Sequence, residues 1–204
     1  MARETRRAIL EATLAFLEAG DAGFTYESLA GRARVARQTL YSQFPDRAQL
    51  FVAAVDHARE RLGADELSVP VYEAATARGA LDALLDFHVA YTPAIMRPAR
   101  VVEARRAGDP ELSRRFEERP SGRRQITRHV VNRLAAEGEL APEWSVERAT
   151  DFLSALMTAS FTSDLLEERG WTTSDLRSSL GMVVATSILA PSAVPTTADE
   201  GGAP

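Results

Sequence analysis

Apolar side chains recur along the chain at the three- and four-residue spacing of α-helices, and patterns that alternate like β-strands are hard to find. Ala, Leu, Arg and Glu dominate the composition, as they do in helical proteins. The apolar pattern predicts about nine helices, over residues 3–19, 26–33, 37–44, 47–62, 72–91, 93–107, 110–137, 145–169 and 173–189. We therefore expect an all-α fold.

Residues that start or stop helices set several of these boundaries. Thr25 is suited to cap the helix at 26–33, Asp46 the helix at 47–62 and Asp109 the helix at 110–137, because their side-chain oxygens accept hydrogen bonds from free backbone N–H groups. Pro93 predicts an interruption after residue 91, and Pro120 with Gly122 predicts a kink or short break within 110–137.

Two segments fall outside this pattern. Residues 63–71, with Pro70 and scattered acids, are expected to form a loop. Residues 191–204 are rich in Pro, Gly and small side chains, which predicts a disordered tail.

Residues 25–50 contain two short helical patterns with only Arg34–Ala36 between them, the connection length of a helix-turn-helix. The outward positions of the second helix are polar: Arg37, Gln38, Thr39, Tyr41, Ser42 and Gln43. Arginine can read guanine and glutamine can read adenine in the major groove, and hydroxyl groups reach phosphates or base edges. The alternative is a solvated helical hairpin, since short helix pairs are common.

The same stretch resembles the DNA-binding signature of the tetracycline-repressor (TetR) family of transcriptional regulators. The shared positions are Thr25, Ala30, Ala33, Val35, Thr39-Leu40-Tyr41, Phe44, Pro45-Asp46-Arg47 and Leu50. The rest of the chain matches that family only in architecture. The resemblance implies a three-helix DNA-binding head at 1–46 and a larger effector-binding and dimerisation body at 47–190.

Two positions depart from the family pattern. Arg34 stands where the family usually has glycine, which suits a left-handed backbone that costs other residues roughly 1 kcal/mol. Arg47 stands where the family tends to have lysine, and arginine keeps the charge.

The resemblance also implies roles for individual residues. The residues expected at the DNA are Thr25, Arg34, Arg37, Gln38, Thr39, Tyr41, Ser42 and Arg47. The first three positions of the second helix, 37–39, would read base edges, and the others would hold phosphates and set the register. We expect a homodimer to bind a palindromic operator as a repressor, and a small effector in the body to release it.

An effector pocket should be mostly apolar with a few polar groups. The candidates are Phe87, His88, Tyr91, Met96, His129, Phe152, Met157 and Phe161. They predict an apolar or aromatic effector. The alternatives are that His88 is a hydrogen-bonded core residue and that the Met and Phe positions are plain core.

Dimerisation is expected through the helices at 145–169 and 173–189, which pair with their copies in the family. Ala155, Ala159, Ser160 and Ser163 would allow close approach between helices. The alternative is that the helix at 145–169 is buried within a monomer.

Charge and composition narrow the function classes. Residues 1–50 carry seven Arg and six acidic side chains, a balance of +1, whereas the rest carries 17 Arg and 23 acids, a balance of −6. This asymmetry suits a DNA-binding head on an acidic body. The rival function is a helical module that binds a protein partner without DNA, and only DNA binding through arginines should weaken steeply with salt.

Enzymatic and membrane functions find no support in the sequence. The chain has no cysteine, its three histidines lack metal-ligand spacing, and no glycine-rich phosphate loop is present. No apolar run approaches the length of a membrane span, and MARETRR is followed by no apolar signal core. We therefore expect a cytoplasmic protein that is not an enzyme and needs no metal or cofactor.

Overall fold

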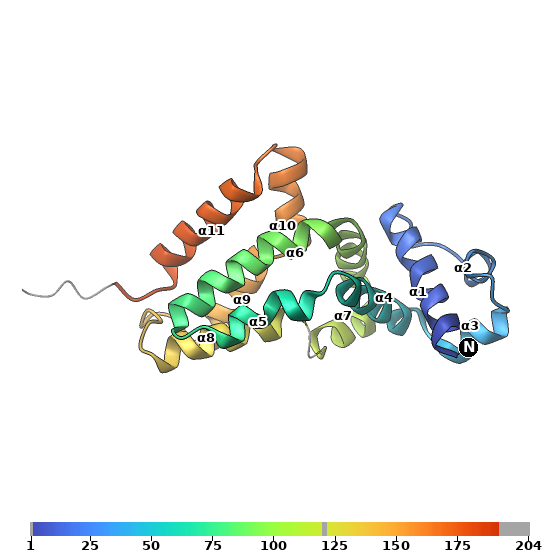
Figure 1. Cartoon of the computed structure of the whole chain (residues 1–204), viewed down its shortest axis with the longest axis horizontal. Helices are drawn as coiled ribbons and strands as arrows, with labels where there is room; N and C mark the ends of the chain where they lie inside the picture. The colour runs from blue at the N-terminus through green and yellow to red at the C-terminus, as the bar shows by residue number, and fades with distance from the viewer. Residues whose placement is uncertain (1, 120–121, 192–204) are drawn as a thin grey trace, which may run out of the picture.

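The computed structural model describes residues 2–119 and 122–191, which form an elongated all-helical molecule (Figure 1). The helices are α1 (Ala2–Glu18), α2 (Tyr26–Ala33), α3 (Arg37–Gln43), α4 (Arg47–Arg61), α5 (Ala64–Glu73), α6 (Ala77–Arg106), α7 (Pro110–Glu117), α8 (Arg123–Ala136), α9 (Val146–Leu156), α10 (Ala159–Ser163), the π-helical turn η1 (Asp164–Glu168) and α11 (Thr173–Ser187). The all-α prediction is confirmed. The tail expected at 191–204 lies outside the described residues, apart from Pro191.

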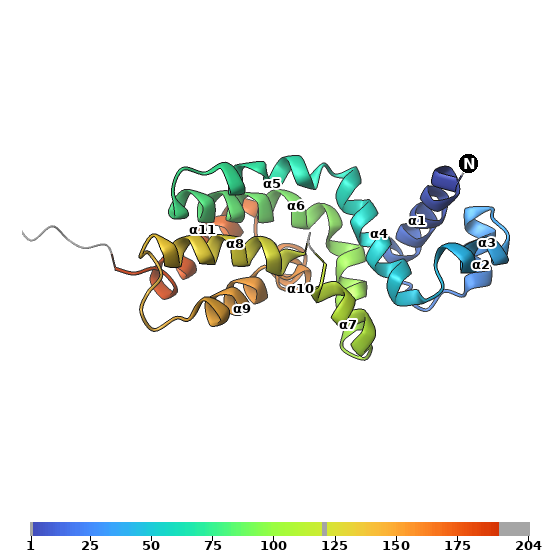
Figure 2. The same cartoon turned by 90° about the horizontal axis from the view of Figure 1, so that it is seen from below.

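Helices α1–α3 form a small head at one end of the molecule, and α5–α11 form the body (Figures 1 and 2). Helix α4 joins the two parts. Its side chains Leu50, Phe51, Ala54 and Val55 belong to the core of the head, and that core also includes Val102 of α6 and other body side chains. The head is therefore packed against the body through α4 and is not attached by a free linker.

Three predicted caps are present. The hydroxyl Oγ1 of Thr25 accepts from Ser28 N at 3.0 Å, and the carboxylates of Asp46 and Asp109 accept from backbone N–H groups at 2.7 and 2.9 Å. Each cap satisfies an N–H that has no partner within its helix, which explains why these boundaries were readable from sequence.

The loop expected at 63–71 is wrong, because these residues lie mostly in α5. Gly63 adopts a left-handed conformation (φ 61°) just before the helix, and Asp65 and Glu66 occupy its favourable acidic first turn. Ala64 and Val71 are fully buried. Packing of this face on α6 outweighs the cost of Pro70 inside the helix.

The interruption expected at Pro93 is also wrong, because α6 runs unbroken for 30 residues through Pro93 and Pro98. This helix contacts α1, α4, α5, α7, α8, α10 and α11. Burial along the helix, from Leu84 through Met96 to Val102, offsets a cost of about 3 kcal/mol for a proline in a helix interior. A local proline signal cannot report such long-range packing.

The remaining helices break in one expected and one unexpected place. The predicted break within 110–137 falls between α7 and α8, where Gly122 precedes α8; Pro120 lies outside the described residues. The single helix expected at 145–169 is instead α9, α10 and η1. The break between α9 and α10 lies at Thr158, because its hydroxyl accepts from Phe161 N at 3.2 Å and caps the start of α10.

No helix among the described residues is both long enough and apolar enough to cross a membrane.

Candidate nucleic-acid interface and ligand cavity

Buried side chains in the core of the head fix α3 in place, and the outer face of α3 lies at the molecular surface. Leu29 of α2, Leu40 of α3 and Phe44 are fully buried, so the inner face of α3 is fixed against α2 and α1. Between the two helices, Arg34 has φ 56° and ψ 43°, the left-handed conformation anticipated for that position. Its backbone N–H points to the carbonyls of Ala30 and Gly31 at the end of α2.

The outer face of this helix-turn-helix carries polar side chains that the protein itself does not use. Arg34, Arg37 and Gln38 are exposed. Within residues 2–119 and 122–191, their side chains make no hydrogen bond or ion pair, and neither guanidinium group is neutralised. Such groups remain available to bases and phosphates.

The hydroxyl-bearing residues beside them already make some contacts within the protein. Ser42 Oγ donates to Thr39 O at 2.9 Å, and both side chains lie along the exposed or half-buried side of α3. The Tyr41 side chain is exposed, and its ring lies 4.9 Å from that of Tyr26. Tyr26 in turn donates to Phe44 O at 3.3 Å, which ties α2 to the end of α3.

Thr25 and Arg47 are engaged inside the head. Thr25 is exposed but spends its hydroxyl in the capping box with Ser28. Arg47 donates through Nη1 to Ala22 O at 2.9 Å and through Nη2 to Phe24 O, and its guanidinium lies 5.0 Å from the Phe24 ring centroid. These contacts hold the loop before α2 against α4, so Arg47 has a positioning role that its charge alone did not reveal.

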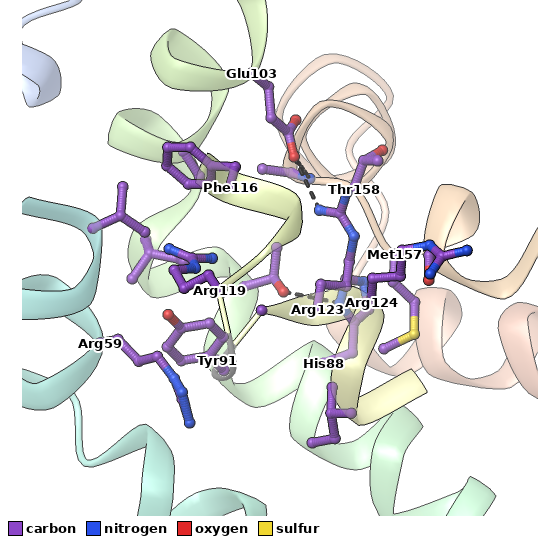
Figure 3. Close-up of a pocket in the computed structure, with 18 of the residues that line it drawn as sticks. Arg59, His88, Tyr91, Glu103, Phe116, Arg119, Arg123, Arg124, Met157 and Thr158 are labelled. Carbon is purple, nitrogen blue, oxygen red and sulfur yellow. Dashed lines mark hydrogen bonds and ion pairs between the residues drawn. The ribbon is translucent and has the colours of Figure 1, made fainter. Parts of the chain in front are cut away.

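A cavity of about 450 Å³ lies in the body, between α4, α6, α7, α8 and the α9–α10 region (Figure 3). This volume falls within the range of ligand sites, roughly 300–1,000 Å³. Four of the eight predicted pocket residues line it, namely Phe87, His88, Tyr91 and Met157.

The other four predicted pocket residues do not line the cavity. Met96 is buried in the interior, and His129 packs on Tyr72 with ring centroids 4.8 Å apart. Phe152 packs on Trp144 at 5.2 Å, and Phe161 packs against the body core. Apolar periodicity places Met96, Phe152 and Phe161 on helix faces, but periodicity does not distinguish a face that borders a cavity from one that borders other side chains.

His88 is buried and hydrogen-bonded on both sides. Its Nδ1 lies 2.8 Å from Thr92 Oγ1 and its Nε2 lies 3.0 Å from Thr162 Oγ1. The Thr162 hydroxyl also donates to Thr158 O at 3.0 Å. It therefore accepts from Nε2–H, and Thr92 donates to Nδ1. Burial, with a smaller contribution from Arg123, lowers the pKa of His88 to about 4, so the ring is neutral at pH 7.

Charged side chains make up a part of the cavity wall that the sequence did not predict. The arginines are Arg59, Arg106, Arg119, Arg123 and Arg124, and the acids are Glu103, Glu117 and Asp151. Arg119 pairs with Asp56 of α4 at 3.2 Å, and Arg123 pairs with Glu103 of α6 at 3.0 Å. These residues come from segments that lie far apart in the sequence, and their charges are spaced as on any solvated helix face. Only the fold brings them together.

Tyr91 adds a further polar group to the wall. Burial raises the pKa of its phenol to about 12, although nearby Arg59 and Arg119 oppose that rise. The phenol therefore stays protonated at neutral pH and can donate a hydrogen bond.

Comparisons with known proteins bear on the fold. No protein-family model matches the chain, and no curated protein matches it. Solved structures do match: a TetR transcriptional regulator from Chloroflexus aurantiacus has TM-score 0.63 and 20% identity, covering 93% of this chain and 98% of that one. A TetR family regulator from Pseudomonas syringae has TM-score 0.62 and 21% identity, covering 91% and 97%. A protein from Saccharomonospora viridis, solved in complex with choline, has TM-score 0.68 and 16% identity, covering 93% and 100%.

The molecule is thus a helix-turn-helix protein with a cavity-bearing helical body. More specifically, it has the fold of the TetR-family transcriptional regulators, as the resemblance of residues 25–50 implied.

Proposed function

We propose that this protein is a homodimeric, TetR-type transcriptional regulator, most simply a repressor, which binds a palindromic DNA operator and is released by a small molecule. The observation that carries the proposal is the outer face of the helix-turn-helix, where Arg34, Arg37 and Gln38 are exposed and without polar partners among the described residues. The head at 1–46 is the DNA-binding unit, and 47–190 is the effector-binding and dimerisation unit. The expected location is the cytoplasm.

Each α3 enters a major groove, and the two heads of a dimer contact successive half-sites. Arg37, Gln38 and Thr39, at the N-terminal end of α3, contact base edges. Phosphates are held by Arg34, Tyr41 and Ser42, with Thr25 assisting at the start of α2. Arg47 acts by holding the loop before α2 in place.

The body cavity is the proposed effector site, and α4 is the route from it to the head. Arg119 lines the cavity and pairs with Asp56 of α4 at 3.2 Å. Four residues earlier in the chain, Arg115 of α7 pairs at 3.1 Å with Asp46, the residue that caps α4. A ligand that displaces α7 therefore shifts α4 and changes the separation of the two heads. The choline bound to the Saccharomonospora viridis neighbour supports a small organic ligand for a body of this fold.

Selection from a random duplex-DNA pool tests DNA recognition. We expect an inverted repeat to be enriched, with binding that weakens steeply as salt rises because condensed counterions are released. On that operator, Arg37→Ala should cost about 1–3 kcal/mol and relax specificity at one position, whereas Arg34→Ala should weaken all sequences alike. Weak, sequence-independent binding would support the rival function, a helical module for a protein partner.

A further inference from the structure

The three carboxylates that line the body cavity all have basic partners. Glu103 accepts from Arg123 and from the backbone N–H groups of Ala159 and Ser160 at the start of α10, at 3.0, 3.3 and 3.2 Å. Asp151 accepts from Arg124 at 2.8 Å. Glu117 accepts from Arg106. Among the described residues, the cavity wall therefore offers no unpaired carboxylate to a cationic ligand.

The unused hydrogen-bonding capacity of the wall consists mainly of donors. The Nε atoms of Arg106, Arg119 and Arg123 are buried and have no hydrogen-bond partner within the described part of the chain. The Tyr91 hydroxyl, which stays protonated, also has no such partner there. These Nε atoms are closed off from the cavity, whereas the protonated Tyr91 hydroxyl can donate to a ligand that supplies an acceptor oxygen.

The balance of charges on the cavity wall also favours an anionic ligand. Five arginines line the cavity against three acids. The other acids that pair with these arginines, Asp56, Asp65 and Glu147, do not line it. A negative group inside the cavity thus meets more guanidinium groups than carboxylates at short range.

Most of the remaining side chains in the wall are apolar, with the hydroxyl-bearing Thr92, Ser154 and Thr158 among them. Leu84, Phe87, Ile126 and Met157 contribute side chains, and His88 is neutral with both ring nitrogens bonded to threonines. Figure 3 shows Arg119 beside Tyr91 at one side of the cavity, with His88 and Met157 farther along it. The site is therefore amphipathic: Arg119 and Tyr91 lie at one side, and apolar side chains share the rest with the paired Arg123 and Arg124.

We propose that the cavity binds an amphipathic organic acid, with its carboxylate at Arg119 and Tyr91 and its apolar body toward Leu84 and Met157. This refines the apolar or aromatic effector expected from sequence, and it rests on the proposed function only in treating the cavity as the effector site. Because the carboxylate competes with Asp56 for Arg119, binding loosens the attachment of α7 to α4.

The test compares three ten-carbon probes that differ in the head group: decanoate, decanol and decyltrimethylammonium. Isothermal titration at pH 7.5 on the full-length protein should give decanoate at least tenfold tighter binding than either of the others. Arg119→Gln should weaken decanoate by about tenfold or more and leave decanol unchanged. Tyr91→Phe, which removes only a hydroxyl, should weaken decanoate by a smaller factor.

Arg128→Gln is the matched control. The Nε of Arg128 is also buried without a partner among the described residues, but Arg128 does not line the cavity. This variant should bind decanoate as the unmodified protein does. Equal or tighter binding of decanol or the ammonium probe, no binding of any probe, or equal weakening of all probes by Arg119→Gln would overturn the proposal. Operator binding without ligand is measured separately, so failure of DNA recognition is distinguishable from failure of the ligand class.

Discussion

At the scale of single residues, Arg34 combines an unfavourable backbone with a useful side chain. It is the only non-glycine residue with positive φ within residues 2–119 and 122–191. A left-handed conformation costs a side-chain-bearing residue roughly 1 kcal/mol. The chain keeps arginine at this position beside α3 despite the cost. This fits the phosphate contact that we propose for its exposed guanidinium.

Replacing Arg34 separates these two effects. Arg34→Gly should raise the free energy of unfolding by up to about 1 kcal/mol by relieving the backbone, whereas Arg34→Ala should not. Both should weaken DNA binding to a similar extent, because both remove the charge. Urea unfolding and operator titration measure the two quantities. If the glycine variant is no more stable than the alanine variant, the backbone at residue 34 is not strained.

Arg47 contributes to the structure of the head more than to its surface charge. Arg47→Lys should lower the free energy of unfolding by about 1–3 kcal/mol, because one ammonium group cannot replace the fork that reaches both Ala22 O and Phe24 O. Arg37→Lys is the control, since Arg37 is exposed and should change stability by less than about 0.5 kcal/mol. Equal stability of the two variants would remove the positioning role.

His88 makes stability depend on pH. Its pKa is near 6.5 in the unfolded chain and about 4 in the folded one, so the unfolded state binds more protons between those values. The His88 contribution is complete above about pH 6.5 and is lost as the pH falls toward about 4, by roughly 3 kcal/mol in total. The difference in unfolding free energy between the protein and His88→Gln, measured across this range, should change by that amount. A constant difference would show that His88 is not buried and neutral.

At the scale of elements, α7 links the cavity region to the N-terminal cap of α4. Arg115 and Arg114 are adjacent on α7, but only Arg115 reaches α4, through Asp46; Arg114 pairs with Glu111 and Glu118 near its own helix. We therefore treat the α7–α4 contact as the coupling element.

Substituting these neighbours tests the coupling. Arg115→Ala should change operator affinity or ligand-induced release by up to about fivefold, the effect expected of a partly exposed ion pair. Arg114→Ala should change neither. Operator titration with and without ligand gives both values. An equal response of the two variants would assign no coupling role to the α7–α4 contact.

Helix α6 shows which features of the helices can be predicted from the sequence and which cannot. Caps were predicted correctly at Thr25, Asp46 and Asp109, because each depends on one side chain and the N–H groups beside it. The prolines of α6 and α5 misled the prediction, since helices packed on several sides tolerate a local cost that an isolated helix does not.

At the scale of the whole molecule, α11 presents apolar side chains to solvent. Met182 and Val183 are 66% and 40% exposed, and α11 lies along one outer edge of the body (Figure 1). The proposed dimer covers this face, together with the region 145–169, and has twice the 22.2 kDa mass of the chain.

Met182→Glu should therefore produce a monomer of 22.2 kDa by light scattering and lose most of its operator affinity. Leu67→Glu is the control: Leu67 is 43% exposed on α5, which lies across α6 from α11 in Figure 1. This variant should remain a dimer. A Met182→Glu variant that stays dimeric would place the interface elsewhere.

The sequence by itself determined the all-helical class, the caps and the helix-turn-helix, because each depends on periodicity or on residues within a few positions of one another. The tertiary structure alone decided that α6 is continuous, that Arg47 is used inside the head, and that Arg119 and Arg123 converge on Tyr91 and His88 in one cavity. Those features depend on contacts between segments far apart in the chain, whose side chains carry no mark in sequence of the neighbours that packing gives them.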